Sequence, residues 1–79
     1  MPRYYFHIRR GEEIAMDPEG VELASPEQAH KEAVLAAREL LAARLLNGEP
    51  IDGDTIEIKD EQATLVDTLP LKSVLDPKA

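Results

Sequence analysis

The longest regular pattern of apolar and polar residues in this chain runs from Ser25 to Gly48. Apolar residues recur there at intervals of three and four, a spacing that places their side chains on one face of a helix. Neither Gly nor Pro interrupts residues 27–47, where Ala, Leu, Glu and Arg, all strong helix formers, predominate. The pattern predicts one amphipathic helix over about residues 26–47, with Ala29, Ala33, Val34, Ala37, Leu40 and Leu41 on its apolar face.

Capping residues delimit this helix at both ends. Ser25 is a favourable N-cap, Pro26 suits the first helical position, and Gln28 completes a capping box with Ser25. Asn47 and Gly48 supply the stop, because Gly readily adopts the left-handed conformation that ends many helices.

Alternation of apolar and polar residues predicts strands on both sides of the helix. Residues 3–10 alternate strictly, and a second extended stretch at 13–23 contains the turn sequence Asp17-Pro18-Glu19-Gly20. Strands at about 54–59 and 64–71 follow the helix. The order β-β-α-β-β predicts an α+β fold in which a four-stranded antiparallel sheet packs one face against the long helix. All 79 residues are expected to form a single domain with a small core.

The last strand contains an irregularity. Leu65, Leu69 and Leu71 are predicted to point inward, but Asp67 falls on the same side and requires a partner or water. Pro70 lacks an amide donor, so the end of this strand is expected at a sheet edge or beyond the hydrogen-bonded ladder.

Composition narrows the class of protein. Cysteine is absent, which excludes disulfides, thiolate metal sites and cysteine nucleophiles. No apolar run approaches the ~20 residues of a membrane span, and the chain begins directly with a strand pattern, so we expect a cytoplasmic protein without a signal peptide. The net charge of −7 disfavours binding to nucleic acid on its own and is compatible with a basic protein partner. It also favours solubility.

Few residues suggest chemistry. Tyr5, His7 and Arg9 are predicted on the sheet face opposite the helix, as an exposed polar face that either is solvated or binds an anion. His30 lies at the flank of the helix, and the two histidines lack the spacing of metal ligands. The acidic segment after Asp52 does not match an EF-hand loop. Phosphate-loop and nucleophile-elbow motifs are missing, so we expect no cofactor, no metal and no enzymatic activity.

Arg44 is anomalous because it falls at the centre of the helix's apolar face. It either extends past the sheet edge, pairs with the acidic loop after Gly48, or pairs with a second chain. A helix of 22 residues is about 33 Å long, whereas a four-stranded sheet is about 19 Å across, so the helix is expected to overhang the sheet. Exposed leucines near its end then predict a homodimer. The candidate interface residues are Leu35, Ala42, Arg44, Leu45 and Leu46.

Two resemblances add to this interpretation. The run Pro2-Arg3-Tyr4-Tyr5-Phe6-His7-Ile8-Arg9, the segment from Asp17 to Leu23 and the ending Leu69-Pro70-Leu71 resemble a family of small bacterial domains of unknown function. That family implies no activity. Residues 26–51 are more weakly similar to HicB-like antitoxin domains, which bind small basic toxins.

The sequence favours a small non-enzymatic interaction module that associates with itself. The first alternative is an antitoxin-like partner of a basic protein. The second is a small anion-binding domain or enzyme that uses the face of Tyr5, His7 and Arg9.

Overall fold

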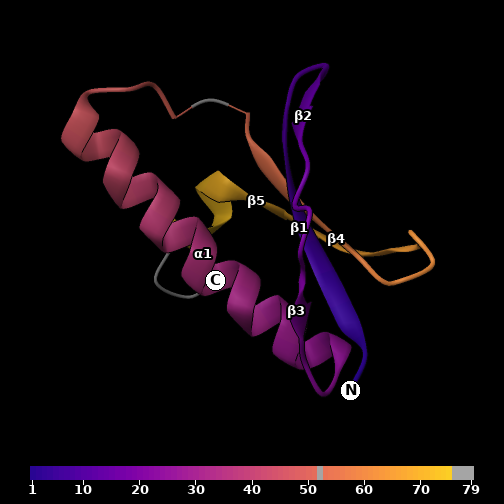
Figure 1. The fold of residues 1–79 in the computed structure, drawn as a ribbon. Coiled ribbons are helices and arrows are strands. Elements are labelled where there is room, and N and C mark those ends of the chain that lie inside the picture. Colours follow the sequence, from indigo (N-terminus) through magenta and orange to yellow (C-terminus); the bar gives the residue numbers. More distant parts are fainter. Residues whose placement is uncertain (52, 76–79) are drawn as a thin grey trace.

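The computed structural model describes residues 1–51 and 53–75, which form an antiparallel sheet covered on one face by a long helix (Figure 1). The central strand β1 (Arg3–Arg10) pairs with β4 (Thr55–Lys59) along one edge. Its other edge pairs with two short strands, β2 (Glu13–Ala15) and β3 (Val21–Glu22). Strand β5 (Leu65–Pro70) extends the sheet beyond β4, and a 3₁₀ turn, η1 (Leu71–Leu75), follows it. The α+β class predicted from the alternation is confirmed.

The described part of the chain contains five strands rather than the four predicted, because the second stretch is divided. The carboxylate of Asp17 accepts hydrogen bonds from the amides of Phe6, Glu19 and Gly20. The Phe6 amide is therefore not available to pair with a continuous second strand. As a result, the chain bends away from β1 between β2 and β3. Gly20 is required there: its φ is +69°, and an added Cβ would lie 2.8 Å from the carbonyl oxygen of Tyr4.

Helix α1 (Pro26–Asn47) packs on the sheet through a narrow line of small residues. The side-chain oxygen of Ser25 accepts from the amide of Gln28, and Gly48 ends the helix in the left-handed conformation. Three alanines are fully buried on this line, which lets the helix backbone approach the strands closely. The core between the layers comprises Tyr4, Leu23, Ala29, Ala33, Ala37, Leu41, Ile56, Ile58, Leu69, Leu71 and Val74.

The irregularity predicted in the last strand takes the form of a register shift. Ile58 faces Asp67 across the two strands, whereas Lys59 faces Leu65, so one residue of β5 is skipped. Leu65 therefore shares the sheet face of Lys59 and is exposed, and the prediction that it points inward is wrong. Asp67 does lie on the helix side, where its Oδ2 is 2.8 Å from Nδ1 of His30.

The last turns of α1 extend beyond the strands, and the chain returns from them to β4 through a connecting loop (Figure 1). The described residues are thin across the two layers, with extents of 37 × 29 × 16 Å. The outer side of α1 is consequently not covered by any other element of the described chain.

Candidate functional site

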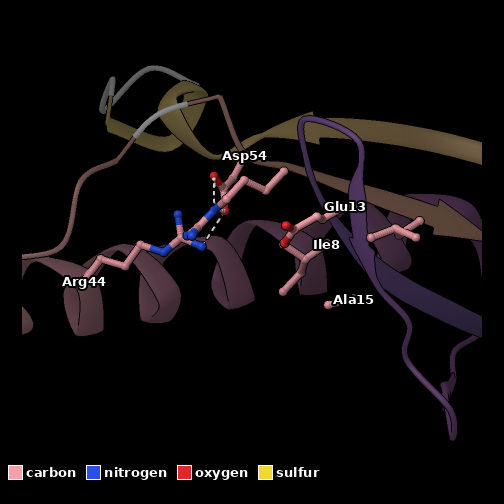
Figure 2. A pocket seen from close by; sticks show the side chains of 7 residues that line it. Ile8, Glu13, Ala15, Arg44 and Asp54 are labelled. Carbon is pink, nitrogen blue, oxygen red and sulfur yellow. Dashed lines mark hydrogen bonds and ion pairs between the residues drawn. The ribbon is translucent and has the colours of Figure 1, made fainter.

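The end of α1 is fastened to the sheet by a cluster of three charged residues. Arg44, in the last turns of the helix, forms an ion pair with Asp54, which immediately precedes β4. Arg10, at the end of β1, donates from Nε to the two carboxylate oxygens of Asp54 at 3.2 and 3.3 Å. Figure 2 shows the Arg44 guanidinium group at the Asp54 carboxylate. We call these three residues the charged clamp.

Two of the three clamp residues are almost completely buried. Arg44 and Asp54 are 7% and 3% exposed, respectively. The hydrogen bond from Arg44 lowers the pKa of Asp54 and outweighs the opposite effect of burial. The same hydrogen bond raises the pKa of Arg44. Nη1 of Arg44 has no hydrogen-bond partner within the described residues. Both charged groups therefore stay ionised at neutral pH.

A hollow of about 310 Å³ lies beside the clamp. Its remaining walls come from the end of β1 and from β2, and the Glu13 carboxylate points toward the guanidinium group of Arg44 (Figure 2). The two arginines already share one carboxylate, which offsets part of their charge. The backbone carbonyl of Asp54 also accepts from the amide of Leu71 at 2.9 Å, so one residue joins α1, β1, β4 and η1. This geometry is that of a structural fastening.

The predicted interface residues occupy two different places. Leu35, Leu45 and Leu46 are 52%, 64% and 88% exposed on the outer side of α1, and Ala42 is exposed among them. We call these four residues the leucine stripe. Arg44, which is predicted with them as an interface residue, lies on the opposite side of the helix and belongs to the clamp. Arg44 was expected to extend past the sheet edge, to pair with a second chain or to pair with the loop after Gly48. It pairs with that loop, through Asp54.

The predicted polar face of the sheet is less exposed than the alternation suggested. His7 is buried, because the turn at Asp17 covers it and the Asp17 amide donates to its Nδ1 at 3.0 Å. Arg9 donates to Glu57 at 2.5 Å, which lowers the pKa of Glu57. The Tyr5 ring stacks near His7, with centroids 6.3 Å apart. Arg9 and the Nδ1 of His7, two of the groups expected to bind an anion, thus already have partners within the chain.

The clamp is absent from the sequence-based predictions, although the sequence contains a signal for it. Arg10 continues the inward alternation of Tyr4, Phe6 and Ile8, and Asp54 continues that of Ile56 and Ile58. Each of the three clamp residues is thus a charged residue at an inward position. Opposite charges at the inward ends of adjoining elements indicate that they meet.

Two further observations concern the residues that the structure describes. No helix among them combines the length and apolarity that crossing a bilayer requires. Nor do three or more His, Asp or Glu side chains of this part of the chain gather where they could share a metal ion.

Comparison with curated proteins and with solved structures finds no significant match. The similarity to HicB-like antitoxin domains is not shown by any of the comparisons. A family model described as a domain of unknown function (DUF6894) matches residues 3–72, from the first residue of β1 into η1. This confirms the predicted resemblance to a small family of unknown function. With the match covering well over half of its length, the chain belongs to the DUF6894 family of domains of unknown function.

Proposed function

We propose that this domain is a small non-enzymatic interaction module that associates with itself through the leucine stripe of α1. The observation that carries the proposal is the exposure of three leucines on one side of one helix, reaching 88% at Leu46. Exposed apolar patches on small proteins usually mark an interface, because leaving them in water is unfavourable.

The state of the polar side chains supports a binding rather than a catalytic role. Ser25 caps the helix, and the hydroxyl of Ser73 donates to the carbonyl of Pro70 at 2.7 Å. Nδ1 of His7 accepts from a backbone amide, and His30 contacts Asp67. The serines and histidines of the chain, its most plausible nucleophiles and bases, thus have structural partners.

The charged clamp explains how the stripe is presented. The last turns of α1 extend beyond the strands, where they would fray without a tertiary contact. The ion pair of Arg44 with Asp54 fixes these turns from the inner side. Leu45 and Leu46 are thereby held on the outer side in a defined orientation.

A second copy of the chain is the simplest partner, because a two-fold axis places one patch against its own equivalent. Light scattering at micromolar concentration tests this. We expect a mass near twice the chain mass of 8.8 kDa for the wild type, and a mass near 8.8 kDa for Leu46→Glu.

Leu65→Glu is the matched control, because Leu65 is 52% exposed, as is Leu35, but lies on β5 away from the stripe. This variant should retain the wild-type mass. A wild-type mass of 8.8 kDa would contradict self-association.

A further inference from the structure

The charged residues beside the leucine stripe are sorted by sign. At about 3.6 residues per turn, Lys31 and Arg38 lie on one side of Leu35 and Ala42, in line with Leu45. Glu32 and Glu39 lie on the other side, in line with Leu46. Each pair is seven residues apart, so each forms a row parallel to the helix axis. We call them the basic row and the acidic row. All four residues are exposed.

These four charges have no ion-pair partners in the described part of the chain, whereas several other arginines do. Arg3 pairs with Glu22, and Arg9 pairs with Glu57. The ion pairs of the described residues do not include the basic row or the acidic row. Their charges are therefore available to a partner.

The local charge of the two rows does not oppose the approach of a second copy at this face. The whole chain carries −7, so two copies repel each other on average. The two rows together contribute two positive and two negative charges and are neutral as a set. A copy approaching through these rows therefore meets less repulsion than the net charge of the chain implies.

Two symmetric arrangements can bring the stripes of two helices face to face. In a parallel pair the two-fold axis runs along the helices, so the basic row of each copy faces the acidic row of the other. In an antiparallel pair the axis is perpendicular to the helices, so each row faces its own equivalent. Rows of opposite sign attract and rows of the same sign repel, which is how flanking charges select helix orientation in coiled coils.

We infer that two copies associate with their α1 helices parallel and in register, each basic row facing the acidic row of the other copy. This inference rests on the proposed self-association and specifies its geometry. Lys31 then lies near Glu32 of the second copy, and Arg38 near Glu39 of the second copy. Leu35, which lies between the rows, meets its own equivalent, and Leu45 of each copy lies near Leu46 of the other.

A variant with the two rows exchanged tests the orientation. It carries Lys31→Glu, Glu32→Lys, Arg38→Glu and Glu39→Arg, so its composition and net charge equal those of the wild type. Labelling the wild type with ¹⁵N distinguishes the two chains in native mass spectrometry of an equal mixture. Both proteins should form homodimers. Their heterodimer should be depleted about fivefold relative to its statistical share, because in the parallel arrangement like rows then face each other.

A statistical or enriched heterodimer would overturn the parallel arrangement, because antiparallel rows of the two proteins are complementary. Wild type that stays monomeric would overturn the proposed function itself, so the two failures are distinguishable.

Cysteine variants give a second measurement that tolerates a poorly folded row exchange, since the chain has no cysteine of its own. Leu35→Cys should form a disulfide dimer alone, because Leu35 lies between the two rows. Leu45→Cys should cross-link to Leu46→Cys when the two variants are mixed. Cross-linking of Leu35→Cys only when it is mixed with Leu46→Cys would show the antiparallel pair.

Discussion

At the scale of single residues, Asp54 is a buried carboxylate with partners on several elements. Its carboxylate accepts from Arg10 and Arg44, and its carbonyl accepts from the amide of Leu71. Removing one partner of a buried ion pair leaves the other charge buried and unpaired. This typically lowers the free energy of unfolding by about 3–5 kcal/mol. For a chain of this size that is a large share of the whole free energy of unfolding.

The first residue-scale prediction concerns pH. The folded-state pKa of Asp54 is lowered, so its ion pair stabilises the fold fully above the unfolded-state pKa of about 3.9 and is lost as the pH falls through the folded-state value. Asp54→Asn should lower the free energy of unfolding at pH 7 by about 3 kcal/mol. The difference from wild type should shrink below about pH 4, as measured by urea denaturation across that range.

Glu12→Gln serves as the control, because Glu12 is an exposed carboxylate in the turn between β1 and β2. It should leave the free energy of unfolding within about 0.5 kcal/mol of wild type. A difference between Asp54→Asn and wild type that stays constant down to pH 2 would show that the aspartate acts through packing rather than through its charge.

Alternation identified inward and outward positions but not what covers the outward ones. His7 lies on the outward face of β1, as the pattern predicts, yet it is buried because the turn at Asp17 folds over it. The pattern of a strand contains no information on a loop that packs on its far side. Arg44, in contrast, was recognised as anomalous from its position alone. The pattern does not identify the ion-pair partner of Arg44, because Asp54 belongs to a loop without periodicity.

At the scale of elements, α1 could be predicted well because its signals are local. The side-chain oxygen of Gln28 accepts from the amide of Ala24 at 3.1 Å, while its own amide donates to Ser25 at 3.2 Å. Both contacts depend on residues within five positions of each other. The capping signals thus act through the chain's own turn and need no tertiary information.

The prediction at this scale is the effect of removing that cap. Ser25→Ala combined with Gln28→Ala should cost about 1–2 kcal/mol, because two amides lose their acceptors. In a domain of this size the loss lowers the thermal midpoint by about 5–15 °C, measurable by circular dichroism. Gln62→Ala, in an exposed turn, should melt with the wild type. A capless double variant with the wild-type midpoint would mean that the helix end is held by its packing alone.

The strands were less predictable because their limits depend on distant residues. The gap between β2 and β3 arises where the Asp17 carboxylate takes the Phe6 amide, a contact across eleven positions. The register shift opposite Lys59 places Leu65 on the outer face, and only the pairing of two strands determines it. A residue skipped in one strand reverses every later side chain relative to its neighbour, so a period of two cannot locate the strand ends.

At the scale of the whole molecule, the fold has a thin core and one face of its helix left over. Ala29, Ala33 and Ala37 bring the helix close to the sheet but bury little apolar area each. Three of the leucines of the helix, which are larger than alanine, lie on its other side in the stripe. A small domain with leucines on its surface rather than in its core gains stability when a partner covers them.

The last prediction couples that stability to protein concentration. If the folded chain is a dimer and the unfolded chain is not, mass action stabilises the fold as concentration rises. Each tenfold increase adds about 1.4 kcal/mol per dimer, or about half of that per chain. The thermal midpoint should then rise by about 3–5 °C per tenfold increase, measured by scanning calorimetry above the dissociation constant. Leu46→Glu should remove the dependence, and Leu65→Glu should keep it. A wild-type midpoint that does not change with concentration would show that the stripe does not stabilise the fold through association. It would contradict the dimer.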